Sequence, residues 1–180
     1  LRHAAVRNSY DAAGRLIRVE TGELDTWQSD SVAPANWIGF TVFTRLDTGY
    51  DSMGRKTRDS VREGTAGPVR GVTDYNYDTV GRLRCTAVRM NPAAFANPPT
   101  DACLPTTPGT EGPDRITLNV YDAAGQRLQL REGAGSGVEA AEATWRYNAN
   151  GQVDTVIDGN GNRAELRYDG HARQARWTFP

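Results

Sequence analysis

The sequence predicts an all-β protein, an antiparallel β-meander of repeated hairpins that forms one curved sheet. The main observation is a short stretch that recurs along the chain, beginning with Tyr-Asp and carrying Gly three residues after the Asp. Other strong turn signals lie between the copies, as a meander requires. The hydrophobic content is 38% and the mean hydropathy is −0.62, which favours a sheet with one-sided burial over a thick globule.

Each copy of the stretch has the composition of a hairpin tip. Asp or Asn suits the first position of a type I turn, where its side chain hydrogen-bonds the backbone two residues on. Gly takes the positive φ that closes a hairpin with a bulge, and the preceding Tyr is a good strand residue. The predicted structural turn residues are Tyr10, Asp11 and Gly14; Tyr50, Asp51 and Gly54; Tyr77, Asp78 and Gly81; Tyr121, Asp122 and Gly125; Tyr147, Asn148 and Gly151; and Tyr168 and Asp169.

The segments between the copies predict about twelve antiparallel strands of roughly five to eight residues each. Near the end of the chain, the turn that begins at Asp158 separates strands expected at 152–157 and 162–167. All Tyr-Asp turns then lie at one end of the sheet. The opposite turns vary freely in length, because the cost of closing a loop grows slowly with its length.

Two insertions interrupt the meander, and we treat residues 1–180 as one repeat segment that contains them. The first insertion is a polar loop at 21–36. The second insertion, at 91–113, holds six of the nine prolines and is therefore excluded from central strand. Within it, Asn91 followed by Pro92 predicts a single helical turn.

The charge pattern indicates no electrostatic partner. The chain has 21 basic and 22 acidic residues, interspersed, with a net charge of −1. Such a distribution provides no basic patch for nucleic acid or for an anionic membrane surface. No apolar run approaches the roughly 18 residues that a membrane span needs. We therefore expect no nucleic-acid partner and no membrane span.

No group of residues predicts catalysis or metal binding. His3 and His171 lie far apart in the sequence, and His171 falls at a turn tip. The stretch that starts at Asp158 is similar to the start of a calcium loop, but Arg163 and Asp169 stand where that loop needs Gly and Glu. Each repeated Asp heads a turn, which favours a structural role over an acid–base pair. We expect no enzymatic activity, no cofactor and no metal.

The tyrosines allow two interpretations. A row of aromatic side chains can stack on sugar rings, whereas Tyr residues at the same height of neighbouring hairpins pack across strands. We favour packing. The tryptophans have no common spacing relative to the turns, and we expect them to cover sheet surface or to anchor loops.

The Tyr-Asp-x-x-Gly-Arg copies resemble the YD repeats of the Rhs/YD-repeat family, which comprises bacterial Rhs polymorphic toxins, the shell proteins of Tc toxin complexes and teneurins. Four copies with their glycines carry the resemblance: Tyr10-Asp11, Tyr50-Asp51, Tyr77-Asp78 and Tyr121-Asp122. Asn148 departs at the Asp, and Ala172 replaces the Gly of the last copy, which leaves its bulge geometry open. The resemblance covers most of residues 4–176 apart from the insertions.

In that family the repeats form a long β-sheet that spirals into a hollow shell around a C-terminal toxin domain. The resemblance therefore implies a structural shell segment of a secreted or cell-surface bacterial protein. Its implied partners are neighbouring repeats of a longer parent chain and an enclosed toxin or effector domain. No stretch matches the self-cleaving aspartate site of the family or a toxin domain, so we expect an internal stretch of shell cut from a longer chain.

Cys85 and Cys103 are the two cysteines of the chain. They form either a disulfide, which would staple the second insertion to the preceding strand, or two unpaired thiols in a reducing compartment. Because the family resemblance implies export, we favour the disulfide.

Two further expectations concern partners. The alternative to a shell segment is a cell-surface adhesion or carbohydrate-binding module that uses the insertions at 21–36 and 91–113. In addition, the sequences near both ends, around Ala5 and over 174–179, carry little charge to protect an open strand edge. We therefore expect the isolated segment to pair edge to edge with copies of itself, or to occur only within a longer chain or assembly.

Overall fold

The computed structural model describes residues 2–179, which form one antiparallel sheet with the strand order β1 to β12. Leu1 and Pro180, the ends of the expected repeat segment, lie outside the described residues. The strands are β1 (His3–Tyr10), β2 (Leu16–Leu24), β3 (Phe40–Tyr50), β4 (Lys56–Glu63), β5 (Val69–Tyr77), β6 (Leu83–Arg89), β7 (Arg115–Tyr121), β8 (Arg127–Glu132), β9 (Ala140–Tyr147), β10 (Val153–Asp158), β11 (Arg163–Tyr168) and β12 (Gln174–Thr178). The predicted all-β meander is confirmed.

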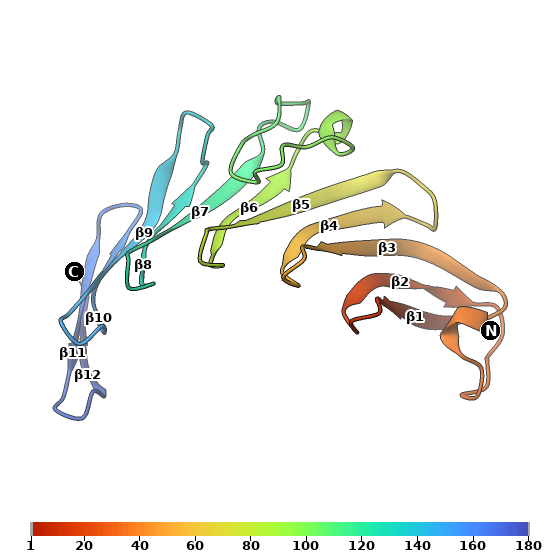
Figure 1. Ribbon diagram of the computed structural model, residues 1–180, viewed down its shortest axis with the longest axis horizontal. Helices are drawn as coiled ribbons and strands as arrows, with labels where there is room; N and C mark the ends of the chain where they lie inside the picture. Colours follow the sequence, from red (N-terminus) through yellow and green to blue (C-terminus); the bar gives the residue numbers. More distant parts are fainter. Residues whose placement is uncertain (1, 180) are drawn as a thin grey trace.

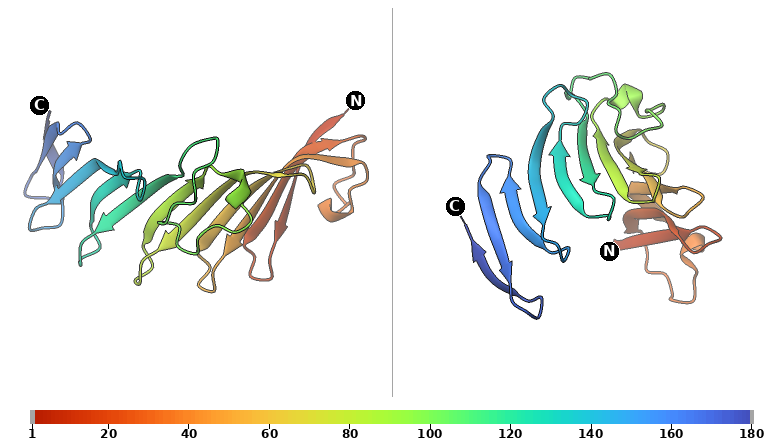
Figure 2. Two further views of the ribbon diagram at one scale, coloured as in Figure 1. Left: turned by 90° about the horizontal axis from the view of Figure 1, so that it is seen from above. Right: turned by 60° about the vertical axis from the view of Figure 1, so that its left-hand side comes forward.

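The sheet is an open, curved band. Figure 1 shows the strands following one another along an arc, with the two termini at its opposite ends. In Figure 2 the Tyr-Asp turns lie along one long border of the band. Because every strand pairs with its sequence neighbours, β1 and β12 each pair on one side only within this chain. Over residues 2–179, no helix has the length and apolar character needed to cross a membrane.

A register shift accompanies each Tyr-Asp hairpin. In the first hairpin the shift falls between Ser9 and Tyr10, and Tyr10 then pairs with Leu16. The corresponding shift occurs in every later hairpin, next to the tyrosine or on the strand opposite it. A bulge bends its strand and increases the local twist. Bulges repeated along one border are therefore a local source of the curvature of the band.

The strands around the first insertion are longer than predicted. β2 continues to Leu24 and β3 begins at Phe40, so the loop spans 25–39 instead of 21–36. β2, β3 and β5 contain 9, 11 and 9 residues, beyond the expected five to eight. The reason is tertiary: the polar end of β2 extends into the predicted loop by pairing with β3, and Leu24 pairs with Phe40. Such pairing overrides weak local strand propensity.

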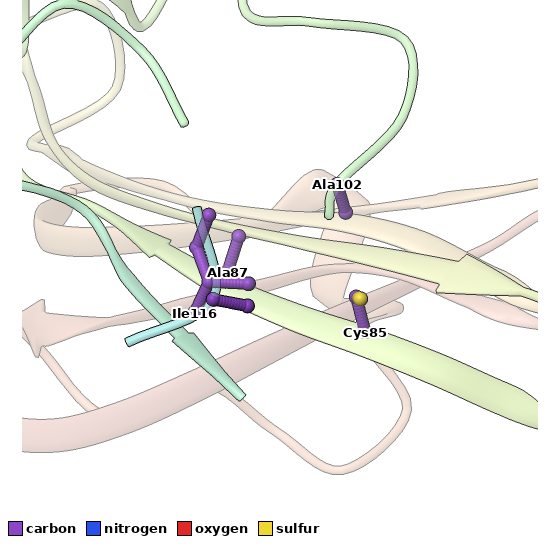
Figure 3. Close-up of a cluster of buried hydrophobic side chains, with 5 residues drawn as sticks. Cys85, Ala87, Ala102 and Ile116 are labelled. Atoms are coloured by element: carbon purple, nitrogen blue, oxygen red, sulfur yellow. The ribbon is translucent and has the colours of Figure 1, made fainter. Parts of the chain in front are cut away.

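One face of the sheet is covered by the insertions, and we call it the loop face. Its buried side chains include Glu20, Asp74, Cys85, Ala87 and Ile116. Ala102 of the second insertion packs in one cluster with Cys85, Ala87 and Ile116, drawn in Figure 3. Because the buried set contains charged as well as small apolar side chains, the layer between the sheet and the second insertion is thin.

A disulfide and an ion-pair cluster hold the second insertion on the loop face. Cys85 on β6 and Cys103 in the insertion form the disulfide, with their Cα atoms 5.3 Å apart. The side chain of Arg89 is fully buried. Its Nε donates to Asp74 Oδ2 and its Nη1 donates to Asp114 Oδ2, both at a distance of 2.8 Å. Asp74 lies on β5 and Asp114 directly precedes β7, so Arg89 joins the sheet to the end of the insertion.

Hydrogen bonds position the ends of the second insertion. The side chain of Asn91 accepts from the amide of Ala93 and caps the 3₁₀-helix η2 (Pro92–Ala94), where the sequence predicted one helical turn. A second 3₁₀-helix, η1 (Pro34–Asn36), lies in the first insertion. Burial raises the pKa of Asp114, but bonds from the amides of Met90 and Thr106 and from Arg89 outweigh it. The net pKa of Asp114 is therefore lowered.

The last Tyr-Asp turn adopts the conformation of the others although it lacks the glycine. The φ angle of Ala172 is 63°, compared with 90° for Gly81, which holds the corresponding position in the third Tyr-Asp turn. This left-handed conformation is unfavourable for a residue with a Cβ. The surrounding hairpin therefore imposes the turn geometry on Ala172, which settles the question that the sequence left open for this copy.

We expect Ala172→Gly to raise the free energy of unfolding by about 0.5–1 kcal/mol, because it relieves the left-handed strain at the expense of some chain entropy. The reverse change, Gly81→Ala, should lower it by about 1 kcal/mol. Chemical denaturation measures both. Ala123→Gly, at a turn position with negative φ, is the matched control and should not stabilise. A neutral Ala172→Gly together with a neutral Gly81→Ala would contradict this account of the turn.

Candidate functional site

The six Tyr-Asp turns share one backbone hydrogen-bonding pattern. The amide of the turn Asp or Asn donates to the carbonyl four residues on, and the amide three residues on donates back, at 2.9–3.2 Å. The side chain of the acid completes the turn: Asp11 Oδ1 accepts from the amides of Ala13 and Arg15, both at 2.9 Å. Asn148 accepts the same two bonds through its amide oxygen. The turn geometry thus needs the oxygen rather than the charge.

In four turns the acid also binds the arginine four residues on. The Arg Nε donates to Oδ2 of Asp11, Asp51, Asp78 and Asp169 at 2.6–2.8 Å. The amide of Arg15 and then its side chain hold the pKa of Asp11 below its usual value, and the amide of Arg55 does the same for Asp51. At Asp78 burial raises the pKa, but bonds from Arg82 lower it further, so the net shift is downward.

The tyrosine of each later turn binds the preceding hairpin, and we call this contact the tyrosine clasp. Its hydroxyl donates to the backbone carbonyl of the fifth residue after the preceding turn Asp or Asn. The five donor–acceptor pairs are Tyr50–Leu16, Tyr77–Lys56, Tyr121–Leu83, Tyr147–Arg127 and Tyr168–Val153, with oxygen–oxygen distances of 2.8–3.0 Å. The clasp therefore recurs at every junction between consecutive hairpins of this chain.

A cation–π contact accompanies the first three clasps. The guanidinium carbons of Arg15, Arg55 and Arg82 lie 4.5–4.9 Å from the ring centroids of Tyr50, Tyr77 and Tyr121. Each arginine therefore binds the acid of its own turn and stacks on the tyrosine of the next. Gln126 and Gln152, which hold the same position, instead donate to a backbone carbonyl of the next turn at 3.3 and 3.2 Å.

Next to the Tyr-Asp turns, the register is the same at all five junctions. The seventh residue after one turn Asp or Asn pairs with the fourth residue before the next. The five pairs are Arg18–Asp47, Arg58–Asp74, Cys85–Leu118, Gln129–Thr144 and Thr155–Glu165. At each junction this is the strand pair closest to the Tyr-Asp turns. The tyrosine clasp therefore closes the border where the backbone ladder between hairpins has already ended.

Ion pairs occupy this junction position at two of the five junctions. Arg18 Nε lies 2.8 Å from Asp47 Oδ1, and Arg58 Nε lies 2.6 Å from Asp74 Oδ1. Both pairs lie on the loop face, where Asp74 also receives Arg89. Opposite charges directly across antiparallel strands stabilise their register, and like charges destabilise it.

A second tyrosine reinforces the junction between the second and third hairpins. The hydroxyl of Tyr75 on β5 donates to Asp59 Oδ2 on β4 at 2.9 Å, and Lys56 Nζ lies 5.6 Å from the ring centroid. Burial raises the pKa of Tyr75 to about 12, and the bond to Asp59 adds to the shift. The hydroxyl therefore stays protonated, and remains a donor, well above the pH at which an ordinary tyrosine ionises.

The predicted turn residues thus lie along one border, and every tyrosine among them except Tyr10 forms a clasp. Tyr10 belongs to the first hairpin of this chain, and its hydroxyl forms no hydrogen bond with another described residue; 58% of the residue is exposed. His3 packs edge-on against Trp27, whereas His171 sits at the last turn. Among residues 2–179 there is no group of three or more His, Cys, Asp or Glu side chains that could hold a metal ion.

Sequence reasoning missed the acceptors of the tyrosine clasp. The signal that could have found them is the constant position of the acceptor, always the fifth residue after the turn acid. That acceptor is a backbone carbonyl, and any residue type can supply it. The side chains at these positions therefore differ, and no motif marks them.

The turn at Asp158 shows which residues of the Tyr-Asp-x-x-Gly motif form the turn and which serve the junction between hairpins. Asp158 Oδ1 accepts from the amides of Asn160 and Asn162 at 2.9 Å, and the amide of Gly161 donates to the Asp158 carbonyl. This turn lies at the opposite border and has no tyrosine before its acid. Asp and Gly therefore suffice for the turn, whereas tyrosine serves the junction.

A pocket with a mainly apolar lining lies under the first insertion. It has a volume of about 370 Å³ and is lined by residues that include His3, Leu24, Trp27, Val32 and Trp37. The residue Trp27 is 69% exposed, so one indole stands at the surface beside the pocket. An exposed indole beside an apolar pocket is suited to apolar groups or to the face of a sugar ring.

Comparisons with known proteins leave the family of the chain unassigned. No family model matches the chain. No curated protein matches it either. Among solved structures, the chain is similar to a TcdB2-TccC3-Cdc42 crystal structure at 12% identity, with 97% of this chain and 12% of that chain covered and a TM-score of 0.26.

Two further crystal structures give comparable results. TcdB2-TccC3 matches at 13% identity, with 97% of this chain and 13% of that chain covered and a TM-score of 0.25. TcdB2-TccC3 without its hypervariable C-terminal region matches at 14% identity, with 99% and 12% covered and a TM-score of 0.24. The chain thus spans about an eighth of the chains it matches, and at these TM-scores we conclude nothing from the likeness.

We expect Tyr121→Phe to lower the free energy of unfolding by about 0.5–1.5 kcal/mol, because it removes one clasp hydrogen bond and keeps the ring under Arg82. Urea denaturation measures the change. Tyr10→Phe is the matched control, since the Tyr10 hydroxyl forms no hydrogen bond with a described residue, and it should change stability by less than about 0.3 kcal/mol. Equal effects of the two substitutions would refute a role for the clasp in stability.

The acid of the turn should make stability depend on pH. The pKa of Asp78 is lowered in the folded chain, so its contribution is present above the ordinary pKa of 3.8 and is lost as pH falls through the lower, folded value. We expect Asp78→Asn, which keeps the turn oxygen, to destabilise at pH 7 and to have a smaller effect near pH 2. Denaturation series at both pH values provide the test. A destabilisation that is the same at both would show that the carboxylate charge is irrelevant.

Proposed function

We propose that the chain is a structural segment of a Rhs-type shell wall, which encloses or presents a C-terminal toxin or effector domain. The observation that carries this proposal is the uniformity of the five junctions in register and in clasp. Junctions that share this register and this clasp let a sheet of one layer extend hairpin by hairpin. That is what a wall built from repeats requires.

The remaining features fit a wall. Repeated bulges along one border curve the sheet without a thick core to support it. The repeated acids are committed to turns and ion pairs, so we propose that the segment has no enzymatic activity. A disulfide suits an oxidising environment outside the cytosol, in keeping with a secreted or cell-surface bacterial protein. Neighbouring repeats of a parent chain and the enclosed domain are the proposed partners.

A second candidate function is supported by the pocket beside Trp27 and Trp37. Exposed indoles stack on sugar rings, so an adhesion or carbohydrate-binding module would place its ligand there. A glycan array separates the two candidates. A wall segment should show no specific glycan, whereas a binding module should retain one, and Trp27→Ala should abolish that signal.

The wall role is tested in the parent protein that contains this segment. We expect electron microscopy to show residues 2–179 in the wall of a hollow shell, and limited proteolysis to leave a C-terminal domain protected. Tyr77→Ala combined with Tyr121→Ala removes two clasps and should accelerate cleavage of that domain. Ser31→Ala, at an exposed position in the first insertion, is the control. A C-terminal domain that is cleaved as fast within the parent as in isolation would overturn the proposal.

A further inference from the structure

Of the two outer edges of the sheet, one carries a clasp donor and the other carries a residue in the position of a clasp acceptor. At the N-terminal edge, Tyr10 holds a hydroxyl without a partner among the described residues. At the C-terminal edge, Gln174 is the fifth residue after Asp169, the position whose carbonyl accepts a clasp at the other five junctions. Arg173, in the position of the stacking arginines, has a side chain that is 75% exposed.

The constant register predicts which residues would meet at a sixth junction on β12. Its seventh residue after the turn acid is Arg176, so Arg176 would face the fourth residue before the acid of an incoming hairpin. Within this chain, the residue four positions before the turn acid faces an arginine at two junctions, and in both it is an aspartate, Asp47 or Asp74. In β1, however, the same position is held by Arg7.

The charges at the two edges therefore do not match each other. None of the five junctions within residues 2–179 places two like charges at this position. Two copies of the chain that joined head to tail in the same register would oppose Arg176 to Arg7. Arg176 is exposed and forms no ion pair with a described residue, whereas Arg7 is held by Glu20 at 2.7 Å.

We propose that the free edge of β12 binds one kind of strand: the first strand of a Tyr-Asp hairpin that carries an acidic side chain four residues before its turn acid. The tyrosine hydroxyl of that hairpin binds the Gln174 carbonyl, its ring lies under Arg173, and its acid pairs with Arg176. Arg176 at the same time disfavours pairing of β12 with the β1 strand of another copy, because Arg7 would face it. This repulsion opposes the simple edge-to-edge self-pairing that we expected from the low charge of the edge sequences.

The proposal rests on the wall role only in naming the partner as another Tyr-Asp hairpin. The register and the charge position come from contacts within this chain. A shell that is not found in the parent protein would therefore leave the edge specificity intact. Conversely, an edge that ignores charge would leave the enclosing role intact.

The experiment converts the edge so that it accepts the chain's own β1. In Arg176→Asp the junction position would hold Asp opposite Arg7, and the exposed pair Val6 and Trp177 would meet next to it on the other face, one residue further along each strand. We expect the wild-type chain to stay monomeric in sedimentation velocity at concentrations where Arg176→Asp forms head-to-tail oligomers, with association at least about tenfold tighter. High salt should weaken that association.

Three controls keep the test specific. Arg70→Asp makes the same charge change away from both edges, beside exposed Glu63, and should leave the chain monomeric. Adding Tyr10→Phe to Arg176→Asp removes the clasp hydroxyl and should weaken association several-fold. Adding Arg7→Asp to Arg176→Asp restores like charges and should abolish it. Circular dichroism establishes that each variant is folded, and Arg176→Glu replaces Arg176→Asp if the latter is not.

Two results would overturn the proposal. One is a folded Arg176→Asp or Arg176→Glu chain that sediments like the wild type. The other is association of Arg176→Asp that Tyr10→Phe leaves unchanged, because the strands would then pair in some other register.

Discussion

The hydrogen bond from a tyrosine hydroxyl to a carbonyl of the preceding hairpin is the interaction on which this sheet depends. The backbone ladder between hairpins ends at the seventh residue after each turn acid, so two residues of strand near every turn lack that support. Only a long side chain with a terminal donor spans the gap, and tyrosine also offers a ring for the neighbouring arginine. The clasp thus lets hairpins diverge at one border without separating, which a curved band requires.

The repeated motif combines two separable devices. Asp or Asn with a residue in the left-handed conformation makes the turn, as the tyrosine-free turn at Asp158 shows. Tyrosine and the arginine that follows the turn make the junction. Because the junction needs a partner on each side, one copy alone would have little to stabilise it. This dependence on neighbours is a general property of repeat proteins, in which each unit buries its surface only against the next.

The sequence allowed the strand count, the order of the turns and the location of the second insertion to be predicted, because each depends on local turn chemistry. It did not allow the ends of β2 and β3 to be predicted, since these are set by the pairing of Leu24 with Phe40. The clasp acceptors were invisible for a similar reason: a backbone carbonyl leaves no trace in residue type. Arg89 was missed because a buried arginine looks, in the sequence, like any charge on an exposed face.

Ion pairs specify the register of the loop face more than they stabilise it. Burying Arg89 between Asp74 and Asp114 carries a desolvation penalty that the attraction only partly offsets, and Arg89 Nη2 has no hydrogen-bond partner within residues 2–179. A shift of the β4–β5 register by one residue, however, would place Asp74 and Arg58 on opposite faces and break their ion pair. In a sheet with so little apolar core, hydrophobic packing alone would tolerate such shifts. The charges therefore supply what the thin core lacks, a single alignment repeated from one hairpin to the next.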